Sequence, residues 1–265
     1  LHLSLRRQRQ MCIRDRELMD LDNRAGKSGG GFCTSFPLYE RPYIFANFNG
    51  TDHDVTVLTH EAGHAFQCYM SRKQPINRYL WPTYEACEIH SMSMEFLTWD
   101  WMELFFKEDT EKFLFKHIAG SLSFLPYGAL VDHFQHWVYE NPNALPKERK
   151  EKWLELEAIY QPDKDYDDLS FLGSGGLWQK QSHIYQVPFY YIDYTLAQVC
   201  AFQFWIKMGI DKESTWKDYL KLCEAGGSLP FLKLVKLANL DSPFDEKVFK
   251  NVANKVDKWL DKNSL

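Results

Sequence analysis

The feature that most constrains this chain is the pentapeptide at residues 60–64, which reads His-Glu-Ala-Gly-His. It lies in a stretch, 53–72, that is predicted to form a helix, with Thr51 or Asp54 as its cap. Positions i and i+4 of a helix share one face, so the imidazoles of His60 and His64 can face one metal ion. The pattern predicts a zinc site, and the plainer alternative is a helix with two solvated histidines.

Glu61 directly follows the first of these histidines. From that position its carboxylate can reach a water at the ion without binding the ion itself. It would accept the proton of that water and later pass it to a leaving amine. Glu61 is therefore the predicted general base of a metal-dependent hydrolase.

A third metal ligand must come from another element, because catalytic zinc usually has three protein ligands and one open position. A second predicted helix, 84–106 with Thr83 as its cap, offers Glu85, Glu88 and Glu95. Glu88 and Glu95 share a helix face, so one can bind the ion while the other accepts a hydrogen bond from an imidazole. Spacing leaves that choice open, and each glutamate could instead be an exposed carboxylate.

An alternative set of possible metal ligands is formed by Asp132, His133 and His136, since residues three apart can share a helix face. No glutamate follows His133 directly, so the geometry for a general base is missing. We interpret these residues as packing or surface residues. His90 lies two positions after Glu88, points away from its face, and is predicted to pack in the interior.

The composition bounds the class of protein. The chain has 265 residues, of which 45% are hydrophobic and 16% aromatic, enough for a substantial core in one large or two small domains. A formal net charge of -5 argues against a nucleic-acid-binding surface. The absence of an apolar run of 18 or more residues predicts no membrane-spanning helix.

The cysteines and the N-terminus indicate the setting of the protein. The six cysteines are scattered without a CxxC pair and no secretory signal is visible, so free thiols and a cytoplasmic location are expected. Residues 1–16 read like a translated sequencing adapter and lack the features of a targeting peptide. We expect them to be a non-native leader and exclude them from the fold.

The predicted fold class is mainly α with a small β-sheet beside the helix of the motif. Segments 26–36 and 41–48 are β-prone and are joined by a turn near Pro37. Gly29, Gly30 and Gly31 would let another backbone approach the edge of this sheet. Further helices are expected at 110–139, 147–160, 183–208, 213–224 and 244–261.

Five sequence blocks, in chain order, resemble the thimet oligopeptidase and oligoendopeptidase F family of zinc metallopeptidases, particularly its bacterial oligoendopeptidase F-like members. They are GKSGGGFCTSF, PYIFANFNG, VLTHEAGHAFQ, EACEIHSMSMEF and PFYYIDYTLAQ, and the resemblance runs from Glu17 to about residue 225. It implies a zincin-like catalytic domain over 17–265 that holds one Zn2+ ion. It also implies hydrolysis of internal peptide bonds in short oligopeptides.

The resemblance assigns roles by position. His60, His64 and Glu88 match the three metal ligands of the family, and Glu61 matches its catalytic base. Glu95 then becomes the carboxylate that orients a liganding imidazole.

The same resemblance implies a late cluster of His183, Tyr190, Tyr191 and Tyr194. A tyrosine hydroxyl would stabilise the developing oxyanion, and His183 would bind a substrate carbonyl or assist the oxyanion. The choice among the three tyrosines stays open, and each could instead be a core residue.

Two glycine-rich segments carry further expectations from the resemblance. Gly29, Gly30 and Gly31 would lie on a strand whose backbone pairs with the bound peptide. Gly173, Gly175 and Gly176 would form a mobile loop near the substrate, or else an ordinary turn.

The chain departs from the family in lacking its long N-terminal helical portion, which forms one wall of the substrate channel. The predicted partners are therefore oligopeptides and that absent portion, with no nucleic acid and no membrane. Three alternatives to the endopeptidase stay open. They are a zinc carboxypeptidase or a hydrolase of folded proteins, a helical binding module with a structural metal, and an inactive fragment that only binds metal.

Overall fold

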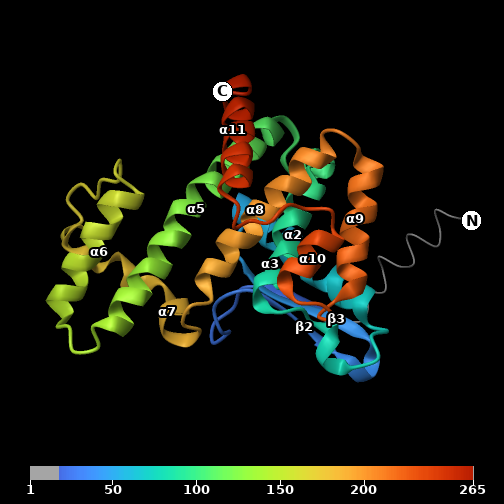
Figure 1. Cartoon of the computed structure of the whole chain (residues 1–265), viewed down its shortest axis with the longest axis horizontal. Coiled ribbons are helices and arrows are strands. Elements are labelled where there is room, and N and C mark those ends of the chain that lie inside the picture. Colours follow the sequence, from blue (N-terminus) through green and yellow to red (C-terminus); the bar gives the residue numbers. More distant parts are fainter. Residues whose placement is uncertain (1–17, 265) are drawn as a thin grey trace, which may run out of the picture.

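The computed structural model describes residues 18–264, in which a small sheet lies at one edge of a mainly helical body (Figure 1). The proposed leader, 1–16, lies outside the described residues. The strands are β1 (Met19–Asp22), β2 (Phe32–Phe36) and β3 (Arg41–Phe48). The helices are α2 (Asp52–Ser71), α3 (Tyr84–Leu97), α4 (Glu103–Phe106), α5 (Thr110–Glu140), α6 (Pro146–Tyr160), α7 (Ser182–Gln186), α8 (Tyr191–Met208), α9 (Lys212–Ala225), α10 (Phe231–Leu237) and α11 (Glu246–Lys262).

The prediction of a mainly helical fold with a small sheet beside the motif helix is confirmed. Strand β3 is central, with β1 parallel to it on one side and β2 antiparallel on the other. The turn predicted near Pro37 joins β2 to β3, and Glu40 closes it with a φ of 50°. The sheet packs against α2, and β2 forms hydrogen-bonded pairs only with β3 among the described strands. Strand β1 and helix α10 were missed by sequence reasoning.

The helix predicted over 84–106 is wrong as a single element. Helix α3 ends at Leu97, and a 3-10 turn, η3 (Trp99–Trp101), separates it from α4. After Thr98 the backbone hydrogen bonds change to the 3-10 pattern, as in the bond from the Trp101 N–H to the Thr98 carbonyl at 2.9 Å. The hydroxyl of Thr98 also donates to the Met94 carbonyl at 2.8 Å, a side-chain bond that is unfavourable inside a helix.

The helix predicted over 183–208 is also divided in two. Helix α7 ends at Gln186 and α8 begins at Tyr191. Pro188 lacks a backbone N–H and disfavours helical geometry at Val187, whose φ and ψ are -141° and 67°. Phe189 then adopts a φ of 64°, which completes the break.

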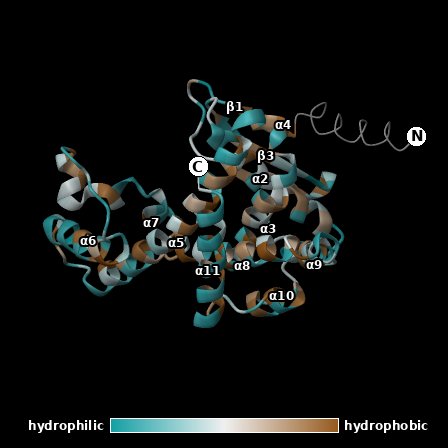
Figure 2. Ribbon diagram, turned by 90° about the horizontal axis from the view of Figure 1, so that it is seen from above, coloured by the Kyte–Doolittle hydropathy of each residue, from teal (hydrophilic) through white to brown (hydrophobic). Residues whose placement is uncertain are grey.

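Two hydrophobic cores share the long helix α5. The larger lies among α3, α8, α9 and α11, and the smaller joins α5 to α6 and the segment before α7. Figure 2 shows the α5–α6 part projecting away from the body formed by α2, α3, α8 and α9. Among the described residues, none of the helices combines the length and the apolar character needed to traverse a bilayer. The described cysteines, Cys33, Cys68, Cys87, Cys200 and Cys223, are free thiols.

Candidate metal centre

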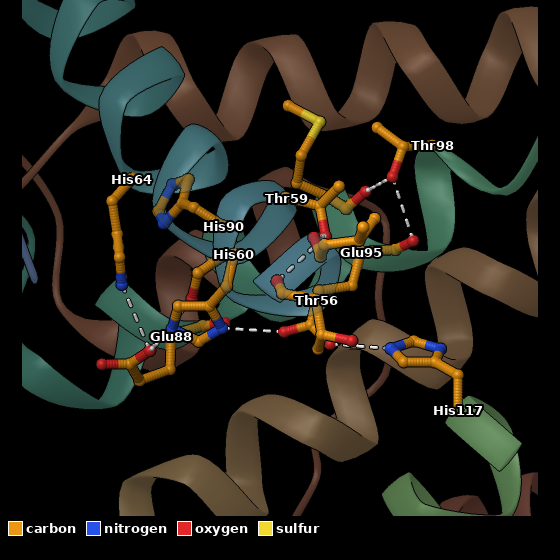
Figure 3. A network of polar contacts seen from close by, with 12 residues as sticks. Thr56, Thr59, His60, His64, Glu88, His90, Glu95, Thr98 and His117 are labelled. Carbon is orange, nitrogen blue, oxygen red and sulfur yellow. Dashed lines mark hydrogen bonds and ion pairs between the residues drawn. The ribbon is translucent and has the colours of Figure 1, made fainter. Parts of the chain in front are cut away.

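Helices α2 and α3 bring the two histidines of the motif and one glutamate to a single point (Figure 3). Oε2 of Glu88 lies 3.2 Å from Nε2 of His60 and 3.3 Å from Nε2 of His64. The three donor atoms lie within 4.8 Å of one another, and no other such group of three occurs in residues 18–264. Two imidazoles and one carboxylate form a donor set typical of catalytic zinc, so the residues fit this metal.

The charges within the cluster favour a cation. Burial opposes the protonation of His60, but the carboxylates of Glu88 and Glu95 outweigh it and raise its pKa to about 10. Burial likewise opposes the ionisation of Glu88, yet His64 and His60 hold its pKa well below the ordinary value. A divalent ion between these atoms would take the place of imidazole protons, so its binding would release protons.

Glu61 lies beside this cluster with an unused oxygen. Its side chain is buried, with 6% of the residue exposed, and Oε2 has no hydrogen-bond partner in the described part of the chain. Burial raises the pKa of this carboxyl against the opposing effect of His60 and His64. Oε1 faces the start of β2, where a side-chain carbon built on Gly31 would lie 3.4 Å away. A buried polar atom without a partner indicates a site where another polar group binds.

The second ring nitrogen, Nδ1, of His60 and of His64 also has a polar neighbour. Nδ1 of His60 donates to Oε1 of Glu95 at 2.7 Å, and Nδ1 of His64 lies 3.6 Å from the sulfur of Cys87. The hydroxyl of Ser91 donates to Oε2 of Glu88 at 2.9 Å. Glu95 occupies the place expected of an orienting carboxylate. Sequence reasoning missed Cys87 and Ser91, although the spacing from Glu88 to Ser91 on one helix could have indicated the latter.

The predicted histidine and tyrosine residues come together around α7, the N-cap of α8 and α8 itself. The ring of His183 lies 5.1 Å from that of Tyr191, 5.7 Å from Tyr194 and 6.3 Å from Tyr190. Of the three tyrosines, only Tyr190 has a hydroxyl that is hydrogen-bonded to one of the candidate metal ligands: it donates to Oε1 of Glu88. Burial and the Glu88 charge raise the pKa values of Tyr190 and Tyr194, so both hydroxyls stay protonated donors.

Tyr191 also contacts residues of α5. Its ring packs edge-to-face against Tyr127 at 5.9 Å and Phe124 at 5.7 Å, both on α5. This arrangement favours the core interpretation for Tyr191.

Gln181 determines which nitrogen of His183 carries the proton. The side-chain oxygen Oε1 of Gln181 accepts a hydrogen bond from the Tyr127 hydroxyl at 3.0 Å. The side-chain nitrogen Nε2 of Gln181 donates to Nδ1 of His183 at 2.7 Å. The neutral ring therefore carries its proton on Nε2. Burial lowers the pKa of His183, which favours this neutral form. No sequence pattern indicated Gln181 or Tyr127.

His90, His133 and His136, which the sequence also raised as candidates, are not part of the group formed by His60, His64 and Glu88. Nε2 of His136 lies 3.4 Å from Asp132, and Nδ1 of His133 lies 3.2 Å from the Tyr160 hydroxyl. His90 is fully buried, and its Nδ1 bonds to the Ala86 carbonyl at 2.9 Å. Its predicted packing role is confirmed.

The two glycine-rich segments differ in setting. Gly29 and Gly30 are exposed at the approach to β2, and Gly30 has a φ of 92°. Gly175 and Gly176 are buried, and a side-chain carbon on Gly175 would lie 2.2 Å from the Lys150 carbonyl oxygen of α6. The second segment is therefore a packed turn in this structure, rather than an open loop.

The comparisons with known proteins all match peptidases. The model of peptidase family M3 matches residues 5–254. The solved structure of a PZ peptidase A with an inhibitor has 57% sequence identity and a TM-score of 0.93, over 95% of this chain and 45% of that one. An oligoendopeptidase F homolog of Borreliella burgdorferi is 25% identical over 235 residues, and one of Mycoplasma genitalium is 24% identical over 237. These matches cover 84% and 83% of this chain and 38% of each relative, so the chain spans less than half the length of the proteins it resembles.

Proposed function

This chain belongs to peptidase family M3, and on that premise we propose that it is the catalytic portion of a zinc-dependent endopeptidase acting on short oligopeptides. The observation that carries the proposal is the convergence of His60, His64 and Glu88 beside the unpartnered carboxylate of Glu61. The free thiols of the described cysteines support a cytoplasmic setting.

The proposed ligand atoms are Nε2 of His60, Nε2 of His64 and Oε2 of Glu88. A zinc ion held by three such atoms lowers the pKa of water and polarises a carbonyl group. The closeness of these atoms supports the assignment, as does the hydrogen bond from Nδ1 of His60 to Glu95, which would keep Nε2 free to bind the ion.

Glu61 is the proposed general base. Its carboxylate would accept a proton from the attacking water and transfer it to the amine that leaves. The free Oε2 and the raised pKa both suit this role, because a base must be unoccupied and must hold the proton between the two transfers.

His183 and Tyr194 are the proposed donors to the carbonyl oxygen of the scissile bond. Gln181 leaves the proton of His183 on Nε2, and the Tyr194 hydroxyl stays protonated beside it. Donors held in place before the reaction stabilise developing negative charge without a cost of reorientation. Tyr190 would instead hold Glu88, since its hydroxyl is already directed at that carboxylate.

The edge of β2 is the proposed binding surface for the peptide backbone. Among the described strands β2 pairs only with β3, so its outer edge can accept an extended peptide. Gly29, Gly30 and Gly31 lead into this strand, and Gly31 is next to Glu61. Backbone pairing would place the peptide near the base while leaving its side chains little constrained.

The test is cleavage of peptides of graded length and of a folded protein by the complete protein. Internal cleavage of short peptides is expected, lost on treatment with a chelator and restored by Zn2+. Release of single C-terminal residues would replace the proposal with a carboxypeptidase. Zinc binding without any hydrolysis would leave a metal-binding role without peptidase activity. Restoration of activity by Mn2+ or Co2+ but not by Zn2+ would correct the proposed identity of the metal.

A further inference from the structure

A chain of hydrogen bonds begins at Nδ1 of His60 on α2 and continues through α3 to α5 (Figure 3). Nδ1 of His60 bonds to Oε1 of Glu95 at 2.7 Å, and Oε2 of Glu95 bonds to Nε2 of His117 at 2.7 Å. This chain of hydrogen bonds ends at Trp99 on η3, whose indole N–H donates to Nδ1 of His117 at 3.2 Å. His117 and Trp99 have no part in the proposed reaction, and nothing in the sequence pattern indicated them.

The indole determines the direction of every bond in this chain of hydrogen bonds. The Trp99 side chain can only donate, so Nδ1 of His117 must be the acceptor. The proton of the neutral His117 ring is then on Nε2, from which it is donated to Glu95. Glu95 accepts at both oxygens, so His60 donates from Nδ1 and its Nε2, 3.2 Å from Oε2 of Glu88, keeps a lone pair that could bind an ion.

The surroundings keep this arrangement rigid. The side chains of His117 and Glu95 are 5% and 10% exposed. The His117 ring lies 4.8 Å from Phe96 and stacks on Phe113 at 5.8 Å, with 18° between the ring planes. In such an apolar enclosure hydrogen bonds are strong and an unpaired donor is costly, so alternative ring orientations are disfavoured.

We propose that Trp99 and His117 are positioning residues of the metal centre. They act through Glu95: Trp99 selects the His117 tautomer, His117 holds the Glu95 carboxylate in place, and Glu95 aims Nε2 of His60 at the ion. The inference rests on the proposed function, because it takes His60 as a zinc ligand. It adds two residues on η3 and α5 to a centre otherwise formed by α2 and α3.

Zinc affinity of the 265-residue chain, measured by competition with a chromogenic chelator, is the first test. His117→Leu removes the donor to Glu95 and is expected to weaken zinc binding about 10- to 100-fold, the usual range for partners of liganding groups. His117→Gln places an amide donor near the position of Nε2 and is expected to restore most of the affinity. Equal affinity of the parent and His117→Leu would overturn the proposal, as would failure of His117→Gln to exceed His117→Leu.

The tautomer of His117 is the second test, and it needs no zinc. Imidazole 15N NMR of the metal-free chain is expected to show a protonated Nε2 and a bare Nδ1 in the parent. Trp99→Phe should give a mixture of tautomers. Trp205→Phe is the matched control, because its ring packs 6.1 Å from Trp99 but its indole forms no hydrogen bond among the described residues. A proton on Nδ1 of His117 in the parent would overturn the proposal.

These two measurements separate the inference from the proposed function. If the parent chain and a His60→Ala variant bind zinc equally weakly, the proposed metal site fails, and the tautomer experiment still decides the order of the hydrogen bonds. If the parent binds zinc tightly while the His117 and Trp99 variants match it in affinity and tautomer, the metal site stands and the positioning role is rejected.

Discussion

Gly63 on α2 lies directly against Ser91 on α3: a side-chain carbon at position 63 would be 2.6 Å from the Ser91 Cα atom. The same carbon would lie 2.6 Å from the His90 carbonyl oxygen and 2.9 Å from Cβ of Met94. Only glycine permits this approach, because most of the nearest atoms belong to the opposite backbone and cannot move aside. The contact lies between His60 and His64 along α2, and it sets the distance from these rings to Glu88.

Gly63→Ala is expected to push α2 and α3 apart. We expect a loss of about 1–3 kcal/mol in the free energy of unfolding, typical of an added methyl group in a closely packed contact. Zinc affinity should fall as well, because the histidines and Glu88 belong to different helices. Urea unfolding and chelator competition measure the two effects.

Gly120→Ala is the control for this substitution. Gly120 lies within α5 with nothing within 4 Å of the added carbon, so the change should be neutral or stabilise by up to about 1 kcal/mol. If Gly63→Ala had the same stability and the same zinc affinity as Gly120→Ala, the close packing of Gly63 against α3 would not be needed for either property.

Glu61→Gln in the complete protein is expected to keep zinc and lose turnover. The amide has nearly the same shape as the carboxylate but cannot accept the proton of the attacking water, so the rate should fall by at least about 10²-fold. Metal analysis and initial rates on a quenched fluorescent peptide provide the measurement. Asp52→Asn, at the start of the same helix, should leave both unchanged, and near-parental turnover in Glu61→Gln would refute the base assignment.

Tyr190→Phe and Tyr194→Phe are expected to affect different properties. Removing the Tyr190 hydroxyl frees Oε1 of Glu88, so zinc affinity should drop about 10-fold or more. Removing the Tyr194 hydroxyl should lower kcat about 10²- to 10³-fold while zinc affinity stays constant. Tyr191→Phe should change neither, because that ring packs against α5. The opposite pattern for Tyr190 and Tyr194 would exchange their roles.

Asp218→Asn is expected to destabilise the fold at neutral pH by about 1–3 kcal/mol. Oδ2 of Asp218 bonds to Lys207 of α8 at 2.7 Å, and Oδ1 bonds to Lys221 and Asn239 at 3.0 and 2.8 Å. Burial opposes the ionisation of Asp218, but these hydrogen bonds outweigh it and lower its pKa. The contribution is therefore complete above the ordinary carboxyl pKa and is lost as the pH falls through the lowered folded-state value.

Urea unfolding at neutral and acidic pH tests this dependence. The difference in stability between parent and Asp218→Asn should narrow on acidification. Glu213→Gln on the same helix is the control, since the Glu213–Lys217 pair is exposed to solvent and should contribute little to stability at any pH. A difference that stays constant down to acidic pH would show that the charge of Asp218 is not responsible.

Helical spacing predicted that Glu88 and Glu95 share a face, but it could not assign their roles. Seven residues of helix separate them by about 10 Å along the axis. The structure shows that they meet different nitrogens of the same ring, Glu88 at Nε2 and Glu95 at Nδ1 of His60. That division follows from how α3 crosses α2, which no spacing within α3 contains.

The amino-acid sequence by itself determined the relative placement of His60, Glu61 and His64, because these residues lie within about one and a half turns of one helix. It also determined a mainly helical class through its periodicity. Tertiary structure alone decided which carboxylate meets which nitrogen and which tyrosine reaches Glu88. It alone also brought Trp99, His117 and Gln181 into hydrogen-bonding distance of their partners around the candidate site. The physical reason is that these contacts join α2, α3, η3, α5, α7 and α8. The relative placement of those elements depends on the packing of two cores and on contacts such as Gly63 with Ser91.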